Sequence, residues 1–199
     1  VGVRSTRILR VAVTRVLVGL FVAGGVSALA GTSAQAETVA VWDFNTLVTS
    51  GSPATTLPAD IGTGTLYLDG TNGSSVWTPG STQQLTAFDG TASNKHPSTV
   101  TGTDQALVPL NQSANGKSAV FAFSMTGRRD LVVTYATRNT SSGFQTQAWA
   151  YSTDGVSFTA ITPSITGLTT TFQVKFFGPI TALNNAATGY LRVTFTGAT

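Results

Sequence analysis

His96 is the only histidine of this 199-residue chain, so it is the only side chain whose ordinary pKa lies near neutrality. A Ser-His-Asp hydrolase needs such a histidine, oriented by a carboxylate, and a nucleophile on a sharp turn. His96 instead lies in a polar run, 94–97, and the sequence has no Gly-x-Ser-x-Gly pattern. We therefore expect His96 to be a solvent-exposed loop residue and predict no catalytic residues.

The acidic residues offer a second kind of chemistry. They are Glu37, Asp43, Asp60, Asp69, Asp89, Asp104, Asp130 and Asp154. A glycosidase needs two carboxylates that face each other across a cleft. Most of these Asp residues adjoin Gly, Thr or loop segments, where Asp forms turns. We expect no catalytic pair and no cofactor. A structural Ca²⁺ held by one or two Asp with loop carbonyls stays open, with no ligands assigned.

Aromatic side chains could bind glycans by stacking on sugar rings. Trp42, Trp77 and Trp149 are the three tryptophans. In a strand, Trp149 and Tyr151 share one face, opposite Ala148 and Ala150. An exposed pair there would be the stacking platform of a carbohydrate-binding module. The alternative is that both rings pack in the core, as large aromatics usually do.

The elements that must position these residues are strands. Short apolar alternations recur between Gly, Ser, Thr and Asn clusters, which is the pattern of a sandwich or barrel. The clearest runs are 38–44, 65–68, 118–125, 130–138, 144–152, 156–161, 172–177 and 190–196. Alternation predicts one buried face per strand. We expect the inward residues to be Phe121, Phe123, Met125, Leu131, Val133, Tyr135, Phe172, Val174, Phe176, Leu191, Val193 and Phe195.

These runs predict an all-β domain over residues 37–199, an antiparallel, jelly-roll-like β-sandwich. Within it, Asp154-Gly155 stands between two alternating runs, which is the strongest short signal for a hairpin. The two residues predict a tight turn between the strands at 144–152 and 156–161.

The first 36 residues have the order of an export signal. Basic residues 1–15 precede an apolar run at 16–30, and Ala34-Gln35-Ala36 supplies the small residues that the export peptidase reads. The run is shorter than the ~20 residues that span a bilayer and contains Gly24-Gly25. We predict cleavage after Ala36 by the general export route, with no membrane span in the mature chain.

The basic pI of the whole chain does not describe the mature domain, because the predicted signal carries several of the basic residues. The sequence pI is about 9.6, but four of the 11 basic residues lie in the first fifteen positions. Residues 37–199 then carry 11 − 4 = 7 basic and 8 acidic residues, a net charge of −1. A nucleic-acid partner is excluded because the mature domain has no basic excess. The chain also has no Cys, which excludes disulfides and thiol chemistry.

Several segments resemble a group of exported bacterial β-sandwich proteins called PEP-CTERM proteins. These segments are VAVWDFN near residue 39, TRNTSSGF from 137, YSTDGVSFTAI from 151 and YLRVTFTGAT from 190. The resemblance implies export and a sandwich fold but little about activity. Family members continue into a final strand and a Pro-Glu-Pro sorting tail, so the resemblance implies that residues 1–199 lack both.

From these observations we expect a secreted or cell-surface, non-enzymatic β-sandwich protein. Its expected partners are extracellular polysaccharide or surface proteins. Two alternatives stay open. One is a carbohydrate-binding module that uses Trp149 and Tyr151, and the other is an accessory N-terminal domain of an exported enzyme. The sequence starts at Val1 and not at Met, which leaves the true start open.

Overall fold

The protein is described from a computed structural model, which places residues 10–14, 36–44, 56–69, 87–88, 106–109 and 112–199. This part of the chain is nearly all β, and each of its strand pairs is antiparallel. The predicted antiparallel β-sandwich is thus confirmed, while the jelly-roll order of its strands stays a prediction. His96, Trp77, Asp89 and Asp104 lie outside the described residues.

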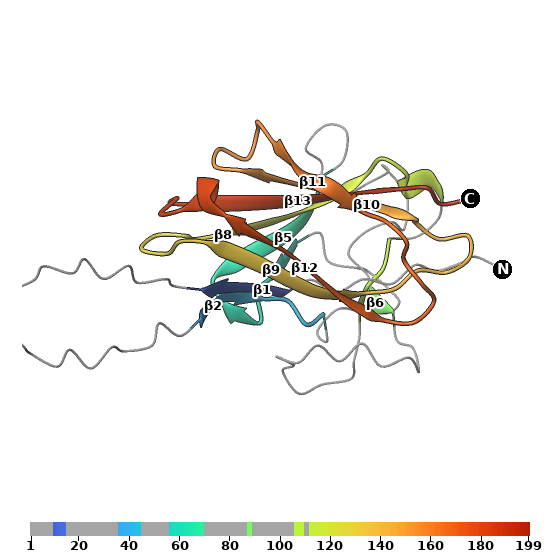
Figure 1. Cartoon of the computed structure of the whole chain (residues 1–199), viewed down its shortest axis with the longest axis horizontal. Coiled ribbons are helices and arrows are strands. Elements are labelled where there is room, and N and C mark those ends of the chain that lie inside the picture. The colour runs from blue at the N-terminus through green and yellow to red at the C-terminus, as the bar shows by residue number, and fades with distance from the viewer. Residues whose placement is uncertain (1–9, 15–35, 45–55, 70–86, 89–105, 110–111) are drawn as a thin grey trace, which may run out of the picture.

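Two sheets form the sandwich (Figure 1). The five-stranded sheet has the order β12-β9-β1-β2-β4, with β12 at Gln173–Ile180, β9 at Leu131–Thr137, β1 at Arg10–Thr14, β2 at Ala36–Val41 and β4 at Ile61–Gly62. The six-stranded sheet has the order β11-β10-β13-β8-β5-β3, with β11 at Thr159–Ile165, β10 at Thr146–Ser152, β13 at Gly189–Thr196, β8 at Ser118–Phe123, β5 at Gly64–Asp69 and β3 at Thr56–Pro58.

Four short elements complete the description. β6 at Ala87–Phe88 pairs with β7 at Ala106–Leu107, and two single 3₁₀ turns cover Gln112–Ala114 and Thr181–Leu183. No helix in the described ranges is long and apolar enough to cross a membrane.

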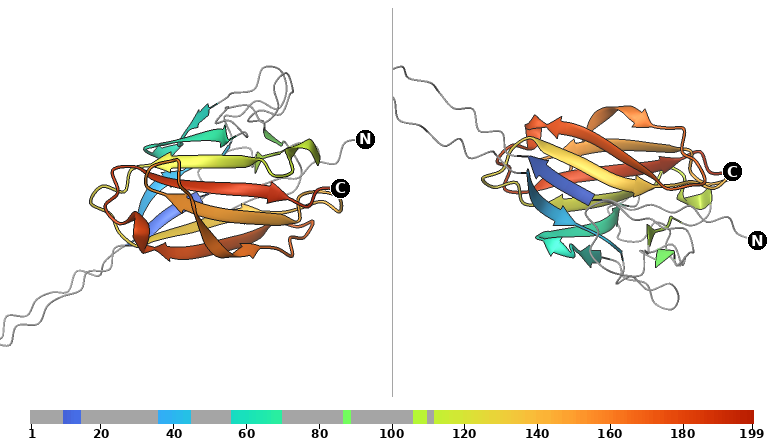
Figure 2. Two further views of the ribbon diagram at one scale, coloured as in Figure 1. Left: turned by 90° about the horizontal axis from the view of Figure 1, so that it is seen from above. Right: turned by 60° about the horizontal axis from the view of Figure 1, so that its bottom comes forward.

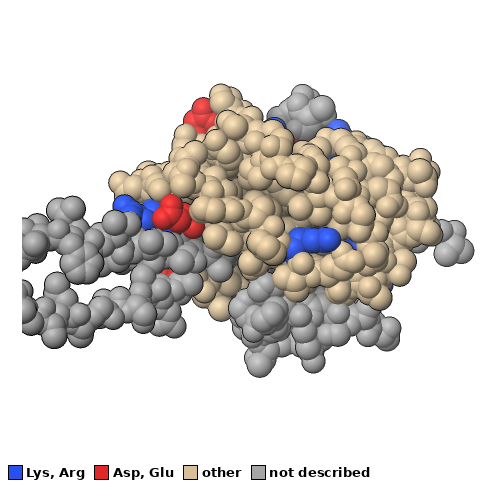
Figure 3. All heavy atoms as spheres, in the orientation of Figure 1, with Lys and Arg blue, Asp and Glu red and all other residues tan. Residues whose placement is uncertain are grey.

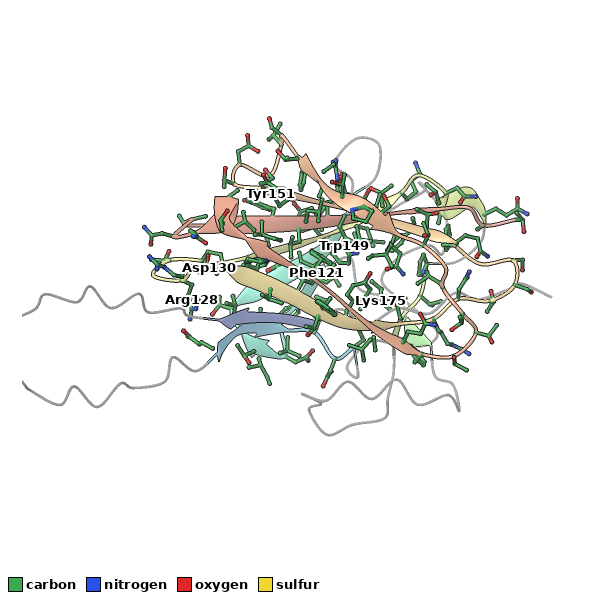
Figure 4. All side chains as sticks on the ribbon, in the orientation of Figure 1. Phe121, Arg128, Asp130, Trp149, Tyr151 and Lys175 are labelled. Atoms are coloured by element: carbon green, nitrogen blue, oxygen red, sulfur yellow. The ribbon has the colours of Figure 1, made fainter. Side chains whose placement is uncertain are left out.

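An aromatic core fills the space between the two sheets (Figure 4). Trp42, which follows β2, meets Phe121 of β8 edge-on, with ring centroids 5.1 Å apart. Trp149 of β10 lies 5.3 Å from Tyr135 of β9 and 5.0 Å from Phe177 of β12. These contacts join strands of opposite sheets, so the rings hold the sandwich together by burying apolar surface from both sides.

The predicted strand faces are confirmed for β8, β9 and β13. The inward residues expected there are each buried: Phe121, Phe123, Met125, Leu131, Val133, Tyr135, Leu191, Val193 and Phe195. The reason is local, because side chains alternate with a period of two and one face of each strand is apolar.

In the run at 172–177 the predicted face is correct for Phe172, which is partly buried against the core, and wrong for the two residues within β12. Val174 and Phe176 are 49% and 73% exposed, and Phe177 packs on the core instead. The pairing register fits this difference, because Val174 and Phe176 lie opposite Ala136 and Thr134, which alternate along β9 with the inward Val133 and Tyr135. Phe176 and Phe177 are both apolar, so either face of β12 could be buried. Pairing with β9 determines that Phe177 is the one that packs on the core.

The hairpin of β10 and β11 is confirmed, but its predicted tight turn is wrong. β10 ends at Ser152 and β11 begins at Thr159, so residues 153–158 form a longer loop. In that loop Asp154 Oδ1 accepts hydrogen bonds from the backbone N–H groups of Val156 and Ser157, which holds the loop in one shape.

Candidate functional site

Trp149 and Tyr151, the predicted stacking pair, lie on the inner face of the six-stranded sheet. Both pair with inward residues of β13, since Trp149 lies opposite Val193 and Tyr151 opposite Leu191. Trp149 is only 4% exposed, and Figure 4 shows it with Phe121 between the sheets. Of the two alternatives left open by the sequence, the structure therefore places Trp149 in the core, where other core rings surround its indole ring.

Trp149 also belongs to a buried polar chain that crosses between the sheets. Its Nε1–H donates to the Tyr135 hydroxyl at 3.1 Å, and that hydroxyl donates to Gln147 Oε1 at 2.6 Å. Gln147 Nε2 then donates to Thr137 Oγ1 at 2.8 Å. Gln147 and Thr137 have no exposed surface and Tyr135 has 1%. Satisfied chains of this kind fix the relative position of the sheets.

Tyr151 is half-buried and lines a cavity of about 420 Å³. This edge pocket lies where β11 and β12, edge strands of the two sheets, face each other. Its other lining residues include Ile161, Thr162, Phe177 and Pro179. The lining mixes apolar and polar groups, and two partly buried rings, Tyr151 and Phe177, belong to it.

A different set of aromatic residues gathers on the outer face of the six-stranded sheet. We use the name outer aromatic patch for these rings together with the two charged residues between them. Its members are Tyr67, Asp69, Phe158, Tyr190 and Arg192. Tyr67 and Asp69 lie on the outward side of β5, since Leu66 and Leu68 between them are buried. Tyr190 and Arg192 lie on the outward side of β13 for the same reason. Figure 2, left, looks onto this sheet.

Register brings these two strands together across β8. Tyr67 and Arg192 both lie opposite Val120, and Tyr190 lies opposite Ala122. The Arg192 guanidinium is 3.6 Å from Asp69 Oδ2 and stands 4.0 Å from the Phe158 ring centre. Burial, together with the nearby Tyr190 and Asp69, raises the pKa of Tyr67 above its ordinary value. Tyr67 therefore keeps its proton and stays a hydrogen-bond donor at neutral pH.

The loop at 153–158 lies across β13 and supports the patch. Gly155 has a φ of +73°, and a Cβ there would lie 3.0 Å from Tyr190 Cζ, so the backbone of Gly155 sits directly against the Tyr190 ring. Hydrogen bonds from the Ser152 hydroxyl and from Val156 and Ser157 lower the pKa of Asp154 to about 2. The ionised Asp154 thus organises a loop that carries Phe158 over Arg192.

Two acidic residues come together near the end of β2. The backbone N–H of Asp43 donates to Asp60 Oδ2 at 2.8 Å. Burial raises the pKa of Asp60, the Asp43 hydrogen bond opposes this, and the charge of Asp43 raises it again. No three Asp, Glu, His or Cys residues of the described segments gather as a metal site. A structural Ca²⁺ stays a prediction with no ligands assigned.

Two further charged residues, Arg128 and Asp130, lie at the turn between β8 and β9 (Figure 4). Arg128, between β8 and β9, pairs with Glu37 at the start of β2, with 2.8 Å between Nη2 and Oε1. The Asp130 backbone N–H donates to Asn184 Oδ1 at 2.6 Å. On the face seen in Figure 3, charged atoms occupy a few separate places on a mostly uncharged surface.

Sequence reasoning missed the outer aromatic patch as a unit. The alternation in 190–196 correctly predicts that Tyr190 and Arg192 point outward. Phe158, however, comes from a loop that no strand period could place, and Tyr67 lies on a strand far away in the sequence. Only the strand order β13-β8-β5 shows that the three rings share a surface. Comparisons with protein-family models, curated proteins and solved structures found no match for this chain.

Proposed function

We propose that this protein is an exported, non-enzymatic β-sandwich that binds extracellular polysaccharide through the outer aromatic patch. The observation that carries the proposal is the clustering of Tyr67, Phe158 and Tyr190 around the Arg192–Asp69 pair on one outer sheet face. Export rests on the order of basic, apolar and small residues in 1–36 and on the PEP-CTERM resemblance. That resemblance also supports a place at the cell surface.

The chemistry of the patch suits a sugar. Sugar rings offer apolar C–H faces that pack on aromatic rings and hydroxyls that hydrogen-bond to planar charged groups. The patch supplies tyrosine rings with hydroxyl groups and a guanidinium beside a carboxylate. Small side chains flank it, because Ala122 lies opposite Tyr190 and Ala150 lies opposite Arg192. The neighbours of the patch on β8 and β10 are therefore small.

Rigidity adds to this fit. Binding is weakened when side chains must be ordered at the moment of contact. Here Gly155 backs the Tyr190 ring, while Arg192 is already held between Phe158 and Asp69. Little further ordering is needed, so even a small patch can hold a repeating polymer through many weak contacts.

Affinity electrophoresis in gels that contain soluble polysaccharides tests the proposal. We expect the wild type to be retarded by at least one polysaccharide and the Tyr67→Ala/Tyr190→Ala double variant to migrate freely. Phe176→Ala is the matched control, because it removes an exposed ring from the outer face of the other sheet. Circular dichroism melting confirms that each variant is folded.

Three results would contradict the proposal. Retardation of the folded double variant would show that the patch does not bind. Loss of retardation in Phe176→Ala would move binding to the other sheet. Release of reducing sugar from a bound polysaccharide by the wild type would make the protein an enzyme.

A further inference from the structure

β1 occupies an interior position in the five-stranded sheet. It lies between β9 and β2 and is antiparallel to both (Figure 2, right). Arg10 to Val13 pair with Thr134 to Leu131 of β9, and Arg10 to Thr14 pair with Val41 to Ala36 of β2. The register shifts between Val11 and Ala12 on the β2 side. β1 therefore supplies the backbone partners for one edge of each neighbour.

This interior strand lies inside the segment that has the order of an export signal. Cleavage after Ala36 would remove β1 but leave Glu37–Val41 of β2 and all of β9 in place. Neighbouring strands lie ~4.8 Å apart, so β2 and β9 would then face each other across a gap of roughly 9.6 Å, one strand wide. Both facing edges would expose unpaired backbone N–H and C=O groups, which favours the addition of a strand.

We propose that this gap is a strand-acceptor slot, filled by β1 in the precursor and by an extended strand of a partner polypeptide after export cleavage. The empty slot and its partner strand rest on the proposed export, because β1 leaves the sheet only if the chain is cleaved after Ala36. The slot selects its occupant by backbone pairing on both sides, as in other cases of strand addition. The occupant runs antiparallel to β2 and β9, has no Pro at its centre, and matches apolar positions to the buried Leu131 and Val133.

Two features favour a separately supplied strand. β1 ends at Thr14 and β2 begins at Ala36, so the two strands are not joined by a tight hairpin turn. A strand can therefore pair with β2 without being linked to it by such a turn. The slot walls are also held independently of β1. β9 pairs with β12 on its other side, β2 pairs with β4, and Arg128 pairs with Glu37 at the start of β2.

Hydrogen exchange on the whole chain tests the slot. Ala12→Pro removes a central backbone N–H, and Ala12→Ser is the matched control that keeps it. We expect Ala12→Pro to lose amide protection in β2 and β9 while β8 and β13 stay protected, and Ala12→Ser to behave as wild type. A peptide of residues 8–16 added to the Ala12→Pro chain should restore the protection. The same peptide with Ala12→Pro should not.

The outcomes separate the two parts of the proposal. Unchanged protection in the Ala12→Pro chain, or equal rescue by both peptides, would overturn the slot. Dimerisation of the Ala12→Pro chain without peptide uptake would assign the slot to a second copy and overturn the partner strand. N-terminal sequencing of the secreted protein that finds residues 10–14 retained would overturn the cleavage step and the partner strand, whatever the peptides do.

Discussion

Tyr135→Phe tests whether the buried polar chain holds the two sheets in place. The substitution keeps the ring, which is 1% exposed, and removes only the hydroxyl. That hydroxyl accepts from Trp149 Nε1 at 3.1 Å and donates to Gln147 Oε1 at 2.6 Å. No water can reach these atoms in the core, so the substitution leaves one donor and one acceptor without partners.

An unsatisfied buried polar group costs about 1–3 kcal/mol, and the two groups can relax only partly toward each other. We therefore expect Tyr135→Phe to lower the free energy of unfolding by about 2–4 kcal/mol. For a domain of this size that corresponds to a fall in Tm of about 4–16 °C. Tyr190→Phe is the control, because its half-buried hydroxyl lies on the outer face and its loss should cost no more than about 0.5 kcal/mol.

Urea unfolding followed by tryptophan fluorescence measures both variants. The midpoint should fall in Tyr135→Phe with an unchanged m-value. Adding Gln147→Met removes the acceptor as well, so the double variant should be less destabilised than the sum of the singles by about 1 kcal/mol. A Tyr135→Phe midpoint equal to that of Tyr190→Phe would refute the stabilising role of the buried hydrogen-bond chain.

Three further predictions concern the loop beside the patch and the acidic pair. The pKa of Asp154 is lowered to about 2, so the ionised carboxylate orders the loop fully above the ordinary Asp pKa. This contribution is lost as the pH falls toward 2. NMR should therefore show the Val156 and Ser157 amides losing protection only as the pH falls below the ordinary Asp pKa. Gly155→Ala forces a Cβ against the Tyr190 ring at a φ of +73°, so polysaccharide retardation should weaken, and unchanged retardation would mean that the loop does not support the patch. The pKa of Asp60 is raised, so its neutral form stabilises the fold at low pH and this contribution is lost as the pH rises. Asn resembles the neutral carboxyl at every pH. Asp60→Asn should therefore unfold at a higher urea concentration than the wild type at pH 7 but not at pH 3.

Much of the fold could be predicted from the sequence because strand alternation is local. The inward faces of β8, β9 and β13 follow from a period of two and an apolar face, with no knowledge of their partners. The β12 face could not be predicted in this way, since both Phe176 and Phe177 are apolar and the pairing with β9 decided between them. β1 was not predicted, because Arg10–Thr14 lies in the segment interpreted as the basic part of an export signal, although its Val residues alternate as in a strand.

The candidate site was less predictable for a related reason. Alternation shows that Trp149 and Tyr151 share a face, but which face turns inward depends on the strands of the opposite sheet. The outer aromatic patch joins residues 67, 158 and 190, which meet only through strand order and one loop. Long-range placement of this kind leaves no signal in any window of the sequence.

The central claim is that polysaccharide binds the outer face of the six-stranded sheet. Hydrogen exchange of the wild type, with and without a polysaccharide that retards it, tests this most directly. We predict that protection will increase in β5, β13 and the loop at 153–158, where the outer aromatic patch lies. Protection confined to β11 and β12, around Tyr151 and the edge pocket, would contradict the account.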